Sequence, residues 1–313
     1  MSDRRIMHKI ADTLFELITG YKGIATTRIL YALQIPNLTE DETTWKSEIW
    51  EADYDGANQK KITSENSYCI CPVFFPKSAG FAKDKFIYVN YKNGQPKIFI
   101  THFGKTQGDS WIPLRGNQLL PTVSSKGDKI AFICDASGRA DLFVQSIDQK
   151  TGLQGKPIRA YSFPNSVQAS PTFSPDSTKI AFVSDKNGTP HIHLINTPTP
   201  GMEKMPIPIS LTKKYKENSC PSWSPDGKKL AYSARISGVR QIMIYDFIAK
   251  EEIQLTFSNY HKENPTWAPN SQHLIYNSVS SSSSELFVIH LQQRVEKKMT
   301  QGPGKKHYPV WGH

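Results

Sequence analysis

The stretch SPTFSPDSTKIAF at residues 170–182 recurs along the chain and decides the fold. Its relatives are CPVFFP at 71–76, LPTVSSKGDKIAF at 120–132, CPSWSPDGKKLAY at 220–232, NPTWAPNSQHLIY at 264–276 and YPVWGH at 308–313. All six align on a proline, and these prolines are 44 to 50 residues apart: Pro72, Pro121, Pro171, Pro221, Pro265 and Pro309. Repeats of this length with alternating apolar positions are typical of β-propeller blades, whereas helical solenoids need a 3.6-residue period that is absent here.

Each repeat predicts four antiparallel strands. The aligned proline lies in the first strand, and a turn such as 225–227 leads to a second strand such as 229–232. A third strand such as 241–245 follows. The fourth ends on an apolar residue and a threonine, as in Leu211-Thr212, Leu255-Thr256 and Met299-Thr300.

The last repeat stops at His313, just after its first strand, and the N-terminal region supplies the missing three. We expect residues 28–32 to form the second strand, 48–53 the third and 60–63 the fourth. Pairing one C-terminal strand with three N-terminal strands closes the ring and leaves no blade edge exposed. The sequence therefore predicts an all-β, six-bladed propeller over residues 25–313.

Residues 1–24 follow a helical pattern instead. Ile6, Ile10, Leu14, Leu17 and Ile18 recur every three or four residues, and Gly20 follows as a helix stop. A single amphipathic helix cannot bury its own apolar stripe. We expect it to lie on the rim of the propeller or to be the last element of a domain that this chain lacks.

Composition narrows the function classes. The chain has 313 residues and a net charge of +10, but its lysine pairs are scattered, which favours solvated strand edges and turns over one anionic partner site. Basic residues are not interleaved with aromatic ones in one stretch, so no nucleic-acid partner is predicted. No run of about 18 apolar residues predicts a membrane span, and Met1 is not followed by an export signal. The four cysteines lack the spacing of a zinc site, so we expect them to be thiols without a chemical role.

Three sets of residues could carry chemistry, and each has a simpler explanation. Asp176 and Asp226 recur at the same turn, which favours turn stabilisation over acid–base catalysis. His191 and His193 could bind a metal from one strand face, but His193 aligns with apolar packing positions. The repeated aromatic residues are expected to pack between blades: Phe74, Phe173, Trp223, Trp267 and Trp311.

Catalytic motifs are absent from the sequence. It contains no nucleophile elbow, no His-Glu-x-x-His and no phosphate-binding glycine loop. We therefore predict a non-enzymatic protein without a cofactor or metal. Two alternatives remain open: a propeller related to those of prolyl-oligopeptidase-type peptidases, and a lyase propeller with a metal in its channel.

A propeller gathers the loops before its innermost strands around one mouth of the channel. These loops hold polar and small residues suited to a reversible protein contact: Tyr68, Gln118, Gln168, Asn218, Ser219, Glu263, Asn264 and His307. We predict that this mouth binds a partner protein. The alternative is that the partner uses the opposite face or the blade edges.

Two segments add a family resemblance to the repeats. ADTLFELITGYKGIATTRILYA at residues 11–32 and ADYDGANQ at 52–59 resemble the TolB family, the periplasmic propeller proteins of the Tol-Pal envelope system. The resemblance implies a monomer that binds the lipoprotein Pal and supports outer-membrane integrity and invagination at cell division. It also implies that the Pal-binding loops include Val167, Gln168, Ala169 and Ser170, and Asn218, Ser219 and Cys220. That family carries a signal peptide and an α/β domain ahead of the helix, so export of this chain and a TolA-like contact are in doubt.

Overall fold

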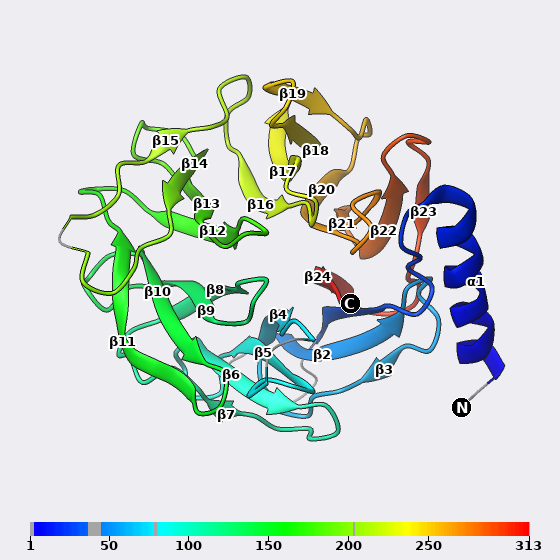
Figure 1. Ribbon diagram of the computed structural model, residues 1–313, viewed down its shortest axis with the longest axis horizontal. Helices are drawn as coiled ribbons and strands as arrows, with labels where there is room; N and C mark the ends of the chain where they lie inside the picture. The colour runs from blue at the N-terminus through cyan, green and yellow to red at the C-terminus, as the bar shows by residue number, and fades with distance from the viewer. Residues whose placement is uncertain (1–2, 37–44, 78–79, 203, 313) are drawn as a thin grey trace.

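The computed structural model describes residues 3–36, 45–77, 80–202 and 204–312. They form six four-stranded antiparallel sheets arranged as blades around a central channel, with one helix at the outside (Figure 1). The predicted six-bladed propeller is confirmed.

The blades follow the chain order of their innermost strands. The first blade consists of β4 (Cys69–Phe74), β5 (Lys85–Asn90), β6 (Lys97–His102) and β7 (Asp109–Ser110). The second consists of β8 (Gln118–Val123), β9 (Lys129–Cys134), β10 (Asp141–Asp148) and β11 (Gly152–Tyr161). The third blade consists of β12 (Gln168–Phe173), β13 (Lys179–Ser184), β14 (His191–Asn196) and β15 (Ile209–Ser210). The fourth consists of β16 (Ser219–Trp223), β17 (Lys229–Ile236), β18 (Val239–Asp246) and β19 (Glu251–Gln254). The fifth is β20 (His261–Trp267), β21 (His273–Val279), β22 (Ser284–His290), β23 (Glu296–Lys298).

The sixth blade joins the two ends of the chain. Its strand order is β24 (Lys305–Trp311), β1 (Arg28–Pro36), β2 (Trp45–Asp53) and β3 (Lys60–Lys61). Ile29 pairs with Trp311 and Leu30 with Val310, and the Trp311 indole N–H donates to Thr27 Oγ1 at 2.7 Å. The predicted closure is therefore confirmed; β1 and β2 are longer than the sequence indicates, and β3 is shorter than the expected 60–63.

A β-bulge repeats at the same place in all six innermost strands. The residue before each aligned proline has a φ between 46° and 53°, in the left-handed region, and the ladder slips there so that two residues oppose one. Non-glycine residues rarely adopt this conformation, least of all before proline. The residue opposite each bulge is a fully buried aromatic: Tyr31, Tyr88, Phe132, Phe182, Tyr232 or Tyr276. The bulge thus fixes how the innermost strand packs on its neighbour.

The recurring turn and strand-end residues have structural roles. Asp176 Oδ1 accepts from Ser174 Oγ at 2.5 Å and from the Thr178 N–H at 3.1 Å, and Asp226 makes the equivalent bonds. Thr300 Oγ1 accepts a hydrogen bond from the Leu286 N–H at 2.9 Å. The threonine that follows a fourth strand thus provides an acceptor for a backbone N–H of the third strand. Gly56 has a φ of 84°, and a Cβ there would lie 2.0 Å from Met299 O, so the Asp-Tyr-Asp-Gly turn requires glycine where it meets the fifth blade.

The helix α1 (Asp3–Thr19) lies beside the turn between β2 and β3 (Figure 1). Arg4 forms ion pairs with Asp53 at 3.1 Å and Asp55 at 2.7 Å, and Asp12 accepts the N–H groups of Ala25 and Thr26. None of its residues is buried, and the whole predicted apolar stripe is exposed. Polar contacts, rather than its apolar face, hold it against the propeller.

His193 occupies an apolar packing position, as the alignment predicts. It lies opposite Phe182, where the other blades carry Phe99, Phe143, Met243 and Phe287. The ring is fully buried, and neither nitrogen has a hydrogen-bond partner among the described residues. Burial, with smaller contributions from Lys186 and His191, lowers its pKa to about 4.

We expect His193→Phe to stabilise the protein, and to do so most at low pH. Between the ordinary pKa of 6.5 and the native value of about 4, the unfolded chain binds a proton that the native ring does not, so stability falls as pH drops through this window. A pKa difference of this size lowers the free energy of unfolding by about 3 kcal/mol at the acid end of this window. Denaturant unfolding at pH 7 and pH 4.5 would measure it, with exposed His102→Phe as control. Equal pH dependence of parent and His193→Phe would contradict this role.

Candidate partner-binding face

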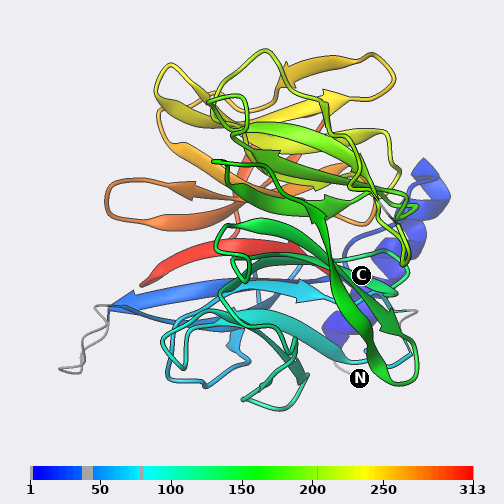
Figure 2. The same ribbon diagram turned by 90° about the vertical axis from the view of Figure 1, so that its left-hand side faces the viewer.

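One face of the propeller carries the loops that precede the aligned prolines. We call this the candidate face: loops 62–68, 111–117, 162–167, 211–218, 255–260 and 299–304, with turns 91–96, 135–140, 185–190, 237–238 and 280–283. In Figure 2 the turn between β21 and β22 (orange) points to the left and α1 (blue) lies on the right. The helix is therefore on the opposite face.

Three of the predicted contact residues are buried inside their blades. Gln118 Nε2 donates to Ile112 O and Leu114 O, and its Oε1 accepts the Ile98 N–H. Asn218 Nδ2 donates to Thr212 Oγ1 and Tyr215 O. Gln168 is 1% exposed and donates to Ser166. All three stand three residues before an aligned proline, and the structure corrects their expected role: they fix the loops and offer no surface to a partner.

The residues directly before the prolines line the channel. Ser170, Asn264, Cys220 and Tyr308 face one cavity of about 190 Å³ at its centre. Asn264 Nδ2 donates to Asn277 Oδ1 at 2.8 Å, and its Oδ1 accepts from Cys220 Sγ at 3.1 Å. Their side chains lie in the throat of the channel rather than on the loop tips.

The predicted residues two before the prolines, Ala169, Ser219, Glu263 and His307, are half-buried at the inner edge of the candidate face. Ser219 Oγ accepts from Arg240 Nη1 at 3.0 Å, and Glu263 forms an ion pair with the same guanidinium at 3.5 Å. Ala169 stands at the equivalent position of β12. Burial, with a smaller contribution from Lys305, lowers the pKa of His307 to about 4, so this ring is neutral at pH 7.

The residues four before the prolines are the outermost of the predicted set. Val167 is 55% exposed, and its backbone N–H donates to Asp185 Oδ1 at 2.8 Å. Tyr68 is half-buried and packs edge-to-face on Tyr91, with ring centroids 5.5 Å apart. Of the predicted residues, Val167 is therefore the one with most side-chain surface available to a partner.

Sequence reasoning missed three exposed aromatic residues on the candidate face. Phe257 is 68% exposed, Tyr260 56% and Phe163 40%. Aromatic side chains are enriched at protein interfaces and among the residues that dominate binding. They lie five to eight residues before an aligned proline, outside the four residues that the sequence prediction considered. An aromatic residue in an otherwise polar loop is the signal that could have found them.

Charge is unevenly distributed on the candidate face. Its exposed basic side chains are Lys92, Arg115, Arg139, Lys213, Lys214 and Lys216, whereas the acidic residues of the same segments, Glu65, Asp135, Asp185 and Glu217, are buried or half-buried. Lys92 pairs with Glu65 at 3.1 Å. The remaining positive charge favours a partner with an acidic surface.

The described residues include no group of three or more His, Cys, Asp and Glu side chains that could hold a metal ion. Within the same residues, no helix has the length and apolar character needed to cross a membrane.

Adjacent positions on the candidate face should respond differently to charge. We expect Gln168→Lys to lower the free energy of unfolding by about 2 to 4 kcal/mol, because it buries a charge without a partner. Val167→Lys should change it by less than about 0.5 kcal/mol, because the side chain is exposed. Urea denaturation of both variants measures the difference. Equal stabilities would mean that Gln168 is accessible after all.

Three comparisons place the chain among known proteins. The TolB beta propeller domain family matches residues 15–313. The TolB homologue of Protochlamydia amoebophila is 47% identical over 263 residues, which is 84% of this chain and 56% of that protein. The homologue of Chlamydia pneumoniae is 39% identical over 263 residues, 84% of this chain and 59% of that protein. This chain thus spans less than two thirds of the length of these curated relatives.

A solved structure supports the fold independently. The crystal structure of TolB from Acinetobacter baumannii superposes with a TM-score of 0.78 at 23% identity, covering 99% of this chain and 72% of the other. At this level of identity the likeness establishes the architecture, and the family rests on the sequence matches.

Proposed function

This chain belongs to the TolB β-propeller domain family, and from that membership we propose that it is a non-enzymatic, protein-binding component of a Tol-Pal envelope system. Its place of work is then the periplasm, where its partner is a peptidoglycan-associated lipoprotein of the Pal type. Through this complex it supports outer-membrane integrity and invagination during cell division.

The observation that carries the binding role is the composition of the candidate face. Exposed aromatic residues, Phe163, Phe257 and Tyr260, stand among exposed basic side chains on loops anchored by six sheets. A rigid platform loses little conformational entropy when a partner docks, so its aromatic contacts contribute fully to affinity. Binding of this kind requires no nucleophile, metal or cofactor.

The exposed stripe of α1 supports a division of the chain into two units. Leu17 and Ile18 are the most exposed apolar side chains of the helix, and none of its residues is buried. We propose that residues 1–24 are a unit distinct from the propeller of residues 25–313, which α1 meets through polar contacts. The propeller itself works as a monomer.

Isothermal titration calorimetry with the periplasmic domain of the Pal-like lipoprotein from the same organism tests the proposal. We expect the double variant Phe257→Ser/Tyr260→Ser to bind at least tenfold more weakly than the parent, because exposed aromatic residues at an interface contribute more than about 1.4 kcal/mol together.

The matched control is Ile207→Ser/Ile209→Ser. Ile207 precedes β15 and Ile209 is its first residue; their side chains are 87% and 69% exposed, away from the candidate face. The control should bind within twofold of the parent. No binding by the folded parent, or equal loss in both variants, would contradict the proposal.

A further inference from the structure

One connection on the face opposite the candidate face departs from the repeat. Between the innermost and second strands, the second to fifth blades have five residues each: 124–128, 174–178, 224–228 and 268–272. The first blade has ten residues there, 75–84, between β4 and β5. Binding residues of rigid scaffolds are concentrated in such loops. The extra length gives the first blade side chains that the other four lack at this place.

This longer connection is anchored to the second blade. The Gly80 N–H donates to Gln149 Oε1 at 2.8 Å, and the Phe81 N–H donates to Gln149 O at 2.5 Å. The Phe81 ring packs against Gly152, where an added Cβ would lie 2.8 Å from the ring. The described part of the connection therefore has a fixed position beside the second blade.

The connection forms one wall of a cavity of about 310 Å³ where the first blade meets the sixth. The aromatic lining consists of Phe74, Phe75 and Phe103. The charged lining consists of Arg28, Lys77, Lys83, Lys85 and Asp84. Small-molecule sites occupy roughly 300–1,000 Å³ and combine an apolar lining with a few polar groups that fix orientation. This cavity has the size and the lining of a small-molecule site.

Positive charge predominates in the cavity, because its four cationic side chains face the single carboxylate of Asp84. Among the described residues, no carboxylate forms an ion pair with Lys77, Lys83 or Lys85. Lys85 is half-buried, its Nζ lies 3.6 Å from the centre of the Phe81 ring, and burial lowers its pKa. A partly desolvated ammonium group without a counter-ion is stabilised when an anion binds beside it.

The guanidinium group of Arg28 is held in place at the same cavity. Its Nη1 donates to the buried Glu51 Oε1 at 2.5 Å, and its central carbon lies 4.6 Å from the centre of the Phe103 ring. Glu51 also forms an ion pair with Lys60 at 2.8 Å, so two cations share its charge. Since a guanidinium has five N–H donors, Arg28 retains donors for a second anion.

We propose that this cavity binds an organic phosphate monoester, with the phosphate among the cationic side chains and the organic group against the phenylalanine rings. A phosphate monoester carries about −1.5 to −2 charges at pH 7, which suits three lysines without carboxylate partners better than the single charge of a carboxylate does. Arginine and lysine are the side chains that proteins most often use to bind phosphate. The same group occurs in soluble esters and in the headgroup of phosphatidic acid.

The test is isothermal titration calorimetry of the full chain with phenyl phosphate, inorganic phosphate and benzoate at constant ionic strength. We expect one equivalent of phenyl phosphate to bind at least tenfold more tightly than inorganic phosphate, which lacks the ring, or benzoate, which lacks the second charge. The double variant Lys83→Met/Lys85→Met should bind phenyl phosphate at least tenfold more weakly than the parent. Melting curves without ligand would show that the variant folds.

Flotation with phosphatidylcholine vesicles that contain phosphatidic acid separates the two sources of the phosphate. Vesicle binding by the parent, but not by Lys83→Met/Lys85→Met, would support a lipid headgroup as the ligand. Binding of phenyl phosphate without vesicle binding would support a soluble ester.

The matched control is Lys228→Met/Lys250→Met, which removes the same charge from two exposed lysines of the fourth blade, outside this cavity. Lys228 lies in the connection equivalent to 75–84. The control should bind phenyl phosphate within twofold of the parent. Equal weakening in both double variants, benzoate binding as tight as that of phenyl phosphate, or no binding of phenyl phosphate by the folded parent would overturn the proposal.

Discussion

Removal of residues 305–313 is expected to abolish the cooperative unfolding of the propeller near the parental melting temperature. These residues contain β24, the innermost strand of the blade that closes the ring. Its loss leaves the backbone groups of β1 that pair with β24 without partners and removes the buried Trp311 side chain from the core. It also removes the Pro309 carbonyl, which accepts a hydrogen bond from Thr266 Oγ1 at 2.9 Å. Open edges and lost core contacts on both sides destabilise the whole ring. Thermal melting followed by circular dichroism measures the effect.

The control for this truncation removes residues 1–20 at the other end of the chain. Since α1 buries no residue, its loss should shift the melting temperature by only a few degrees. A truncation at 304 that melts cooperatively at the parental temperature would show that the ring closes in another way.

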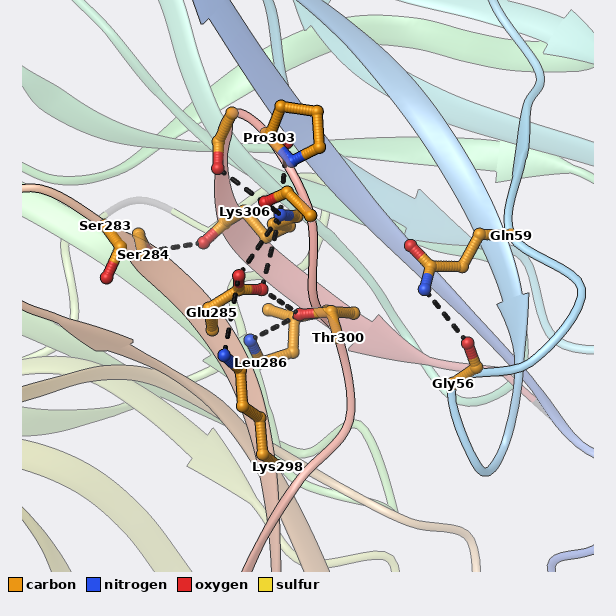
Figure 3. Close-up of polar contacts among 12 residues, drawn as sticks. Gly56, Gln59, Ser283, Ser284, Glu285, Leu286, Lys298, Thr300, Pro303 and Lys306 are labelled. Atoms are coloured by element: carbon orange, nitrogen blue, oxygen red, sulfur yellow. Dashed lines mark hydrogen bonds and ion pairs between the residues drawn. The ribbon is translucent and has the colours of Figure 1, made fainter.

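Lys306→Ala is expected to cost about 3 kcal/mol of stability, because it leaves a buried carboxylate and several carbonyls without their cation. Lys306 is 2% exposed, and its Nζ contacts Gly302 O at 2.7 Å, Pro303 O at 3.2 Å and Glu285 Oε2 at 3.3 Å. Figure 3 shows this ammonium group enclosed by the loop and by Glu285. Chemical denaturation at pH 7 measures the cost.

The matched control is the neighbouring Lys305→Ala. Lys305 is half-exposed, with its Nζ 5.1 Å from the centre of the Trp45 ring, and should contribute less than about 1 kcal/mol. Lys298 also approaches Glu285, at 3.7 Å, but from an exposed position, so it compensates only in part. Equal effects at 305 and 306 would contradict the buried ion pair.

The architecture could be predicted because the repeat is visible in the sequence. The aligned prolines give the number of blades, and the incomplete last repeat leaves the N-terminal strands as its partners. The bulge could not be predicted in the same way. Cys71, Leu120 and Tyr308 share a left-handed backbone although their side chains have nothing in common, so the conformation is imposed by packing against the aromatic residue on the neighbouring strand.

The candidate site was only partly predictable for the same reason. Strand alternation counted back from each proline fails at the bulge, so Gln168 points inward while Val167 and Phe163 face solvent. Contacts between blades also leave no trace in one sequence. The apolar stripe of α1, for example, gives no indication that Arg4 and Asp12 hold the helix in place.

Hydrogen exchange of the propeller with and without the Pal-like lipoprotein tests the central claim most directly, because it locates the bound surface without any mutation. The account predicts slower exchange in loops 162–167 and 255–260 of the candidate face, and unchanged exchange in the turns around Asp176 and Asp226 on the opposite face. Protection confined to those turns or to α1, with the loops of the candidate face unchanged, would contradict it.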